Sequence, residues 1–390
     1  MTGYARASSS GVGLVLAALA AASAVCRCAA AAQWSIEPQL GLLLDYNSNL
    51  LLVPTGEQAS AGMTVSVDAT MKRVTESSEM DLHPHLELQR FPNEQALNAD
   101  NGSVQGSYAA RAERSSVTVT GSYEEASTLT TELSETGIVD TSTRRETTTA
   151  GLTLGHDFSE RQHLDLQGAY TNVIYPGGEQ VGLVGYRYPS GTLTDTFSVS
   201  ERTSLAAGAV VDQLKAPLTG YEAHDQGLRL TLKHAFSTRL SVSAVAGGTN
   251  TTVAGVTQHG YVWDLHATYS SLLTQWDVDY SQSLQPSGRG YLVRRDAGNL
   301  TVSHNVAPRL YATLTVQDIR NSEVAGGPFY DVPRYFFGDA GFDWHASERI
   351  VVSVTAGIAE LEEPVSYQTA RGWHAAVNTR WTPMPLRVSR

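Results

Sequence analysis

The chain has 390 residues, of which 42% are hydrophobic, and its formal net charge at pH 7 is −12. This acidity argues against nucleic acid as a partner, because binding to phosphates requires an excess of basic side chains. Its two cysteines, Cys26 and Cys28, both lie near the N-terminus, so disulfides do not hold the rest of the chain together.

The first 32 residues have the pattern of a secretory signal. Arg6 supplies a positive charge, residues 12–25 form an apolar stretch, and Ala29 to Ala32 offer small residues for cleavage. We therefore expect a signal peptide over 1–32 and one domain over 33–390. After the signal, no apolar run approaches the roughly 20 residues that a membrane-spanning helix needs.

A short turn motif then recurs at intervals of about 34 to 41 residues. A serine precedes a polar residue and an arginine in four copies, which are Ser159-Glu160-Arg161, Ser200-Glu201-Arg202, Ser237-Thr238-Arg239 and Ser347-Glu348-Arg349. Between the last two of these lie Ser270-Ser271 and Ala307-Pro308-Arg309, which complete the series. Between consecutive turns lies a longer polar segment, for example 126–145, 214–225, 249–259 or 320–333. Short and long connections in strict alternation are typical of an outer-membrane β-barrel.

The segments between these connections alternate apolar with polar residues, as strands with one buried face do. Leu228, Leu230 and Leu232, for example, alternate with Arg229 and Lys233. We expect about 16 to 18 such strands, most consistently 18, each long enough to cross the apolar layer when tilted. The predicted fold is all-β: a transmembrane antiparallel up-and-down β-barrel with short periplasmic turns and long extracellular loops.

If the apolar face contacts lipid, the polar face lines the lumen, where charged rows set ion preference. The candidate lumen-lining residues are Asp81, His83, Glu87, Asp165, Arg229, Lys233, Asp264, His266, Asp277, Asp279 and Arg380. They could equally just solvate the lumen and pair with one another. Aromatic residues expected at the pore mouth could stack on sugar rings or pack the loops, and they are Tyr186, Tyr188, Tyr291, Tyr330 and Tyr335.

The sequence offers little that indicates catalysis. No Gly-x-Ser-x-Gly motif is present, and a hydrolase needs a nucleophile and a base within hydrogen-bond reach. His83 and His85 alternate with Asp81 and Glu87 at a spacing that could hold a metal, but a lumen-facing strand produces the same row of polar residues. We therefore predict no catalytic residue, no metal site and no cofactor.

Several loops resemble those of the β-barrel porin 2 family, over about residues 34 to 382. The similar stretches are Asp45-Tyr46-Asn47-Ser48-Asn49, residues 127–145, Tyr186-Arg187-Tyr188 and residues 285–291. The resemblance implies a role in exopolysaccharide or capsule export, with polysaccharide as cargo and periplasmic export components as partners. The chain departs from many outer-membrane barrels in ending on Arg390 rather than on an aromatic residue, and Trp381 could take that part.

We therefore expect an integral β-barrel of the bacterial outer membrane, in contact with its lipid, that acts as a pore in polysaccharide export. A general or nutrient-uptake porin is the first alternative. An outer-membrane hydrolase and a non-conducting scaffold are further alternatives.

Overall fold

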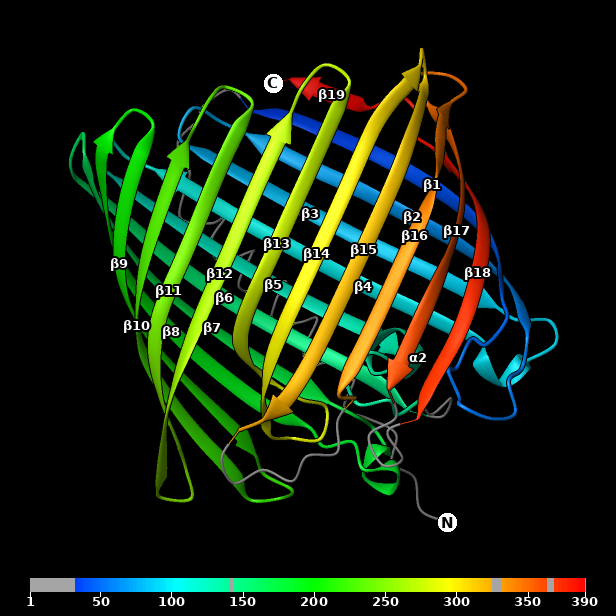
Figure 1. The fold of residues 1–390 in the computed structure, drawn as a ribbon. Coiled ribbons are helices and arrows are strands. Elements are labelled where there is room, and N and C mark those ends of the chain that lie inside the picture. The colour runs from blue at the N-terminus through cyan, green and yellow to red at the C-terminus, as the bar shows by residue number, and fades with distance from the viewer. Residues whose placement is uncertain (1–31, 140–142, 325–331, 363–367, 390) are drawn as a thin grey trace.

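The structure, a computed structural model, describes residues 32–139, 143–324, 332–362 and 368–389. Eighteen long antiparallel strands form one closed barrel (Figure 1). They are β1 (Gln33–Asn47), β2 (Ser60–Val74), β3 (Ser78–Arg90), β4 (Ala99–Arg111), β5 (Ser115–Ser127), β6 (Arg144–Ser159), β7 (Gln162–Ile174), β8 (Tyr186–Ser200), β9 (Thr203–Ala216), β10 (Tyr221–Ala235), β11 (Leu240–Val253), β12 (Val256–Ser270), β13 (Thr274–Pro286), β14 (Leu292–Ala307), β15 (Leu310–Glu323), β16 (Arg334–His345), β17 (Ile350–Glu362) and β18 (Thr369–Trp381).

The barrel closes between its first and last long strands. β1 pairs with β18 from Leu40 opposite Trp381 to Asn47 opposite His374. A short strand, β19 (Leu386–Ser389), follows β18 and pairs with the beginning of β1. Because each long strand pairs with the strands before and after it, the spanning region has no open edge, as a backbone in hydrocarbon requires. The predicted up-and-down barrel is confirmed.

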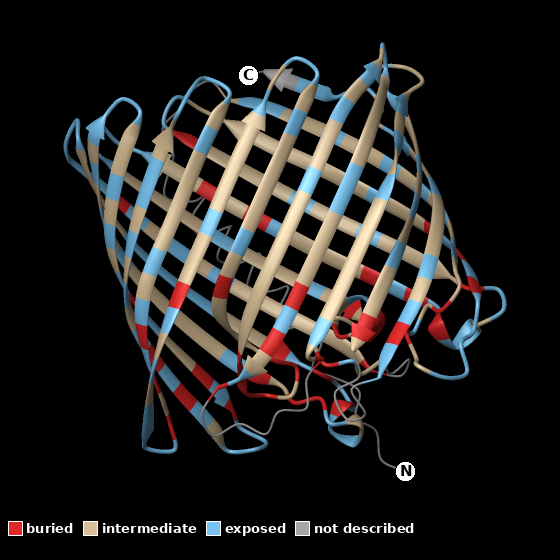
Figure 2. Cartoon of the chain, viewed as in Figure 1, coloured by how far each residue is buried: buried red, intermediate tan, exposed pale blue. Residues whose placement is uncertain are grey.

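Alternation of the side chains gives the barrel two different faces. On β10, Leu228 is 72% exposed and Leu230 is 68% exposed, whereas the intervening Arg229 is only partly exposed. Exposed and less exposed positions alternate in the same way along many strands (Figure 2). The apolar outer face is the surface that hydrocarbon covers in a membrane.

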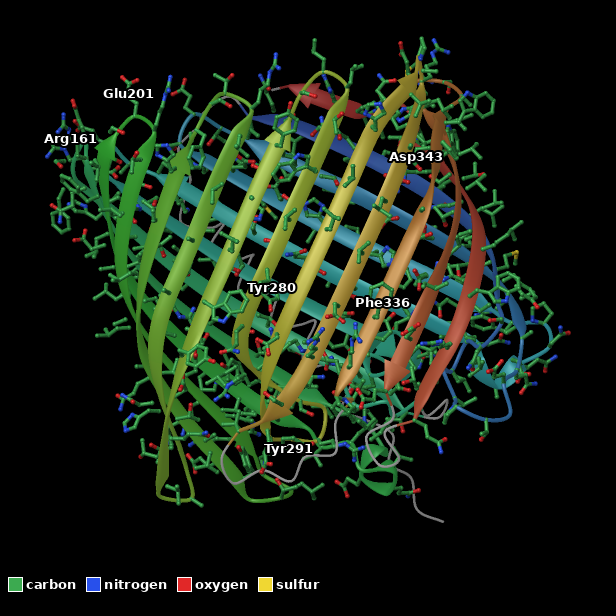
Figure 3. The ribbon with its side chains drawn as sticks, viewed as in Figure 1. Arg161, Glu201, Tyr280, Tyr291, Phe336 and Asp343 are labelled. Carbon is green, nitrogen blue, oxygen red and sulfur yellow. The ribbon has the colours of Figure 1, made fainter. Side chains whose placement is uncertain are left out.

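The recurring serine of the short turns caps the turn with its own side chain. Ser237 Oγ accepts hydrogen bonds from the backbone N–H groups of Arg239 and Leu240, both over 3.1 Å. Ser347 Oγ does the same for Arg349 and Ile350, over 3.2 and 3.1 Å. A serine hydroxyl thus satisfies turn donors that no strand partner reaches. Arg161 and Glu201, from two of these turns, lie at one end of the barrel (Figure 3).

Two expected long loops are mostly strand instead. The predicted loops at 214–225 and 249–259 are wrong, because β9 runs to Ala216 and β10 begins at Tyr221, while β11 and β12 are joined by two residues. Ala254 (φ 49°) and Gly255 (φ 81°) make this tight turn, with positive φ at both central positions. At these strand ends the exposed side chains are polar, as at Lys215 and Glu222, whereas Leu214 and Ala223 on the other face are buried. The pattern of exposed apolar residues that marks the spanning region therefore stops there although the strands continue.

Helices are minor features of the described segments. α2 (Thr128–Thr131) lies in the connection between β5 and β6, and two single turns of 3-10 helix occur at Gln95–Leu97 and Gly178–Val181. No helix in the described ranges is long and apolar enough to cross a membrane. The predicted signal segment lies, apart from residue 32, outside the described residues, so the signal peptide stays a prediction.

Candidate functional site

The inner face of the barrel carries all of the candidate lumen residues. Each one alternates along its strand with outward apolar side chains. Residues that pair across neighbouring strands lie on the same face of the sheet, so the register places the candidates on one face. Asp81 lies opposite Lys72, whose Nζ is 3.8 Å from Asp81 Oδ1. His266 lies opposite Asp279. The structure brings together His266, Asp277 and Asp279, but it leaves the others distributed over β3, β7, β10, β12 and β18.

Carboxylates outnumber arginine and lysine on the inner face of the described strands. The acids include Glu37, Asp45, Asp68, Asp81, Glu87, Asp165, Asp212, Asp225, Asp264, Asp277, Asp279, Asp339 and Asp343. The basic side chains there include Lys72, Arg145, Arg229, Lys233, Arg295 and Arg380. A wall of this composition favours cations over anions within the lumen.

Residues 128–139, in the connection between β5 and β6, fold across the mouth of the barrel, at the end opposite the short turns. Ser127 begins α2 as its N-cap, since its Oγ accepts a hydrogen bond from Leu129 N over 3.2 Å. Leu133 packs against two separate groups of loop residues, one near β17 and β18 and one near Phe91 and Leu97. Ile138 packs against a third group, near β7 to β11. The segment 128–139 therefore touches the wall at several points around the mouth.

Glu132 is the centre of this crossing segment. Its side chain is fully buried, yet it is acidic. Its carboxylate accepts hydrogen bonds from the Tyr175 hydroxyl over 2.6 Å and from the Thr136 hydroxyl over 3.0 Å. Arg145 Nη1 lies 3.5 Å from Glu132 Oε1. The residues that hold the segment in place thus come from its own turn and from the ends of β6 and β7.

Burial changes the proton affinity of Glu132. The pKa of its carboxyl is raised from the ordinary 4.5 to about 7, because loss of solvation and the nearby Glu135 raise it by more than Arg145 and the two hydrogen bonds lower it. Burial and the neighbouring Glu132 also raise the pKa of the Tyr175 hydroxyl. Glu132 therefore keeps its proton to a higher pH than a solvated glutamate does.

Glu135 joins the crossing segment to the opposite loops. Its carboxylate lies 3.6 Å from Arg145 Nη1 and 3.4 Å from Arg295 Nη1. Its carbonyl oxygen accepts a hydrogen bond from Val332 N over 3.1 Å, and Asn321 Nδ2 donates to Val332 O over 2.8 Å. The two long loops predicted at 126–145 and 320–333 therefore meet at the mouth. We call residues 128–139, with Arg145, Tyr175 and Arg295, the latch.

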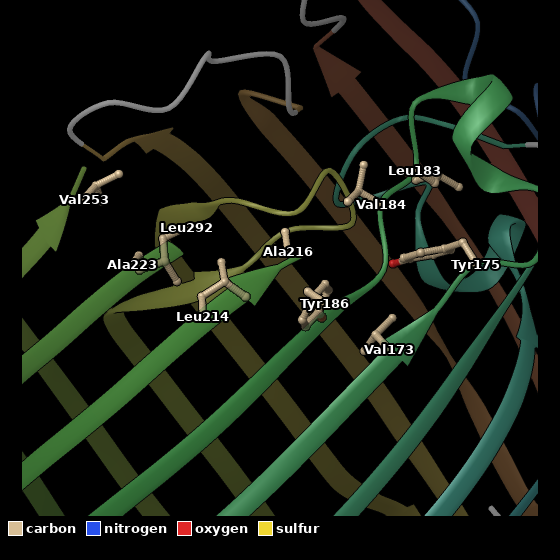
Figure 4. Close-up of a cluster of buried hydrophobic side chains, with 10 residues drawn as sticks. All are labelled: Val173, Tyr175, Leu183, Val184, Tyr186, Leu214, Ala216, Ala223, Val253 and Leu292. Atoms are coloured by element: carbon tan, nitrogen blue, oxygen red, sulfur yellow. The ribbon is translucent and has the colours of Figure 1, made fainter. Parts of the chain in front are cut away.

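Most of the predicted mouth aromatics are packed. Tyr186 is 5% exposed and Tyr291 is 6% exposed. Tyr186 belongs to a hydrophobic cluster with Val173, Tyr175 and Leu214 (Figure 4), against which Tyr188 also packs. Tyr335 packs on the cluster near β17 and β18. The buried rings of Tyr186 and Tyr291 therefore offer little surface on which a sugar could stack. Tyr330 lies outside the described residues.

A cavity of about 750 Å³ opens at the same end of the barrel. It lies between the tips of the β9–β10 and β11–β12 hairpins and the loop that carries Arg289 and Tyr291. Tyr221, Glu222 and His224 complete much of its lining. Its lining thus combines aromatic, acidic and basic side chains with several glycines.

The sequence indicated 126–145 and 320–333 as long loops, but it did not identify the residues that form the latch. Glu132 and Glu135 stand in a polar loop of a kind that is usually solvated, and Arg295 is about 160 residues away in sequence. The only available signal was the capping serine before a short run of threonines, which indicates a helical turn but not what the turn contacts.

No family model and no curated protein sequence matches the chain. The resemblance to the β-barrel porin 2 family therefore stays a prediction. Among solved structures, a BenF-like porin from Pseudomonas fluorescens Pf-5 is similar with a TM-score of 0.52 and 11% identity, over 91% of this chain and 99% of that chain. The outer membrane protein opdK from Pseudomonas aeruginosa aligns with a TM-score of 0.48 and 10% identity, over 90% of this chain and 99% of that chain.

At these identities the likeness is one of fold. It agrees with the geometry of the chain, which has a closed ring of strands, an apolar outer face and a polar inner face. A barrel with these faces can bury its outside only in a lipid layer. The chain is an integral β-barrel of the bacterial outer membrane.

Proposed function

We propose that this chain is a passive outer-membrane pore that admits small hydrophilic solutes, as a general or nutrient-uptake porin does, and that it prefers cations. The observation that carries the proposal is the polar, predominantly acidic inner face of a closed eighteen-stranded barrel. A barrel of this strand number encloses an aqueous channel unless loops fill it.

The latch favours uptake of small solutes over polymer export. It crosses the extracellular mouth and is fixed by the Glu132, Glu135, Arg145 and Arg295 contacts, so it narrows the passage. A polysaccharide chain would have to displace it. Export was the function implied by the family resemblance, and it is now the second candidate. No described contact favours a hydrolase or a scaffold.

Liposome swelling tests the proposal. Vesicles containing the purified barrel are placed in iso-osmotic solutions of neutral sugars of increasing size. We expect fast swelling with monosaccharides and slower swelling with trisaccharides, because passive flux falls as solute size approaches pore size. Absence of swelling with any solute contradicts the proposal.

A deletion strain separates uptake from export. Under the uptake proposal, growth on limiting small solutes falls and extracellular polymer is unchanged. Loss of extracellular polymer with unchanged uptake would instead support the export candidate.

A further inference from the structure

The inner wall of the barrel contains an imidazole between two carboxylates on neighbouring strands. His266 on β12 lies opposite Asp279 on β13, and Asp277 precedes Asp279 by two residues on the same face. One ligand atom from each of these three side chains lies within 4.8 Å of the others, and no other such group occurs in the described ranges. We propose that His266, Asp277 and Asp279 form a binding site for a divalent transition-metal ion, such as Zn²⁺.

The hydrogen bonds assign a role to each of the three residues. His266 Nδ1 lies 2.6 Å from Asp279 Oδ1. A carboxylate that accepts the Nδ1 proton fixes the ring orientation and leaves the Nε2 lone pair free for a metal ion. Asp279 is therefore the positioning residue of the site.

Asp277 supplies the second ligand. Its Oδ2 lies 3.7 Å from His266 Nε2. Two ligands at about 2.0 to 2.2 Å from a tetrahedral ion are roughly 3.4 Å apart, so a small side-chain movement closes this pair around a metal. The lumen supplies water for the remaining positions.

The site is open to water. His266, Asp277 and Asp279 are 38%, 45% and 39% exposed, so a hydrated ion reaches them without any movement of the backbone. Ligands on two paired strands of a closed barrel are also held rigidly, which lowers the cost of ordering them on binding.

The local charge also favours a cation. Asp264 is on the same inner face, two residues from His266, and adds a third carboxylate to this part of the wall. No lysine or arginine forms a salt bridge with Asp264, Asp277 or Asp279 in the part of the chain that the structure describes. Asp81, by contrast, lies beside Lys72. The carboxylates near His266 therefore lack a basic partner that a metal ion would have to displace.

The presence of imidazole selects the class of ion. Mg²⁺ and Ca²⁺ prefer sites made of oxygen alone, whereas a neutral imidazole with a carboxylate suits Zn²⁺, Ni²⁺ and Cu²⁺. We therefore expect Zn²⁺ to bind and Mg²⁺ not to compete at equal concentration.

Titration calorimetry of the untagged, detergent-solubilised barrel with Zn²⁺ tests the site. We expect one binding event that His266→Ala and Asp277→Asn each weaken by more than tenfold. Asp279→Asn should weaken it by roughly 10-fold or more, as loss of a carboxylate that orients a ligating histidine does. Unchanged Zn²⁺ affinity in His266→Ala, or absence of binding by the unmodified barrel, overturns the proposal.

His83→Ala is the matched control. His83 is also an inner-face histidine, but its Nδ1 lies 3.1 Å from the Thr70 hydroxyl and not beside a carboxylate that would position the ring. We expect His83→Ala to bind Zn²⁺ as the unmodified barrel does, and an equal loss in both histidine variants also contradicts the assignment.

Binding is measured without ion flow, so its outcome is independent of the proposed pore function. If the barrel conducts, Zn²⁺ at binding concentrations should also reduce the single-channel current, and His266→Ala should abolish that reduction.

Discussion

The Tyr175 hydroxyl donates a hydrogen bond to the buried Glu132 carboxyl over 2.6 Å, and this contact joins the end of β7 to the segment that crosses the pore mouth. Glu132 is fully buried, and the side chains that face it are Thr136 and Glu135 from its own segment, Tyr175, and Arg145. Opening of the latch returns this carboxyl to water.

Raising the pH should open the latch. The pKa of Glu132 is about 7 in the latched state against 4.5 in water, so the latched state holds the proton between these values. The free-energy preference for the latched state over the open state is greatest below pH 4.5 and falls as the pH rises to 7. Above pH 7 it stays at its lowest value. We expect the open fraction in single-channel recordings to increase from pH 5 to pH 7.5.

Glu132→Gln provides the control, because an amide keeps the shape of the side chain and does not titrate. Its open fraction should be independent of pH over the same range. A pH dependence of the same size in Glu132→Gln would show that another group is responsible.

Replacing Gly288 should loosen the latch. A Cβ atom added at Gly288 would be 2.3 Å from Glu132 Oε2, and the Tyr175 hydroxyl would be 2.9 Å away. Gly288→Ala must therefore displace the buried carboxyl, and we expect larger and noisier conductance with an unchanged barrel, measured in planar bilayers. Gly168→Ala on β7 is the control, since nothing lies within 4 Å of its added Cβ. Equal conductance in all three proteins would contradict the role of the latch.

Neutralising inner-face charges should change ion preference in opposite directions. Asp165→Asn removes a carboxylate and should reduce cation preference, whereas Arg229→Gln removes a guanidinium and should increase it. The measurement is the reversal potential in a tenfold KCl gradient, with opposite shifts of a few millivolts expected because each change alters one charge in a wide, screened lumen. Shifts of the same sign would contradict the assignment of these residues to the lumen.

Removing a turn serine should destabilise the barrel locally. Ser237→Ala leaves the N–H groups of Arg239 and Leu240 without the hydroxyl acceptor, and loss of an intramolecular hydrogen bond costs about 1 kcal/mol. We expect a lower urea midpoint of unfolding, followed by tryptophan fluorescence. Thr238→Ala, at the next turn position, should leave the midpoint unchanged. Equal effects of the two changes would mean that the serine hydroxyl is not what stabilises the turn.

The barrel could be predicted from the sequence because the features that indicate it involve residues close together in the chain. Alternation along each strand, as at Leu228 and Arg229, and the capping serine of each short turn both act within a few residues. Strand ends beyond the membrane, such as Tyr221 to Gln226, have polar exposed side chains and no longer show the exposed apolar face of the spanning region, so their extent could not be predicted.

The contacts within the latch and the metal-binding group could not be predicted for a different reason. Each depends on which strand or loop lies beside another, as Glu135 lies beside Arg295 and His266 beside Asp277. From the sequence, a metal site was considered instead at histidines and acids that alternate on a single strand, such as His83 and Glu87. The best-placed ligand atoms lie across two strands, and this requires the register between them.

The account depends most directly on passive, cation-preferring conduction through the lumen. The decisive measurement is the current through single purified barrels in a planar bilayer under a KCl gradient. We expect an ohmic current with a reversal potential whose sign shows that K⁺ passes more readily than Cl⁻. A bilayer that contains folded barrels and carries no current, or a current that prefers anions, would contradict the account.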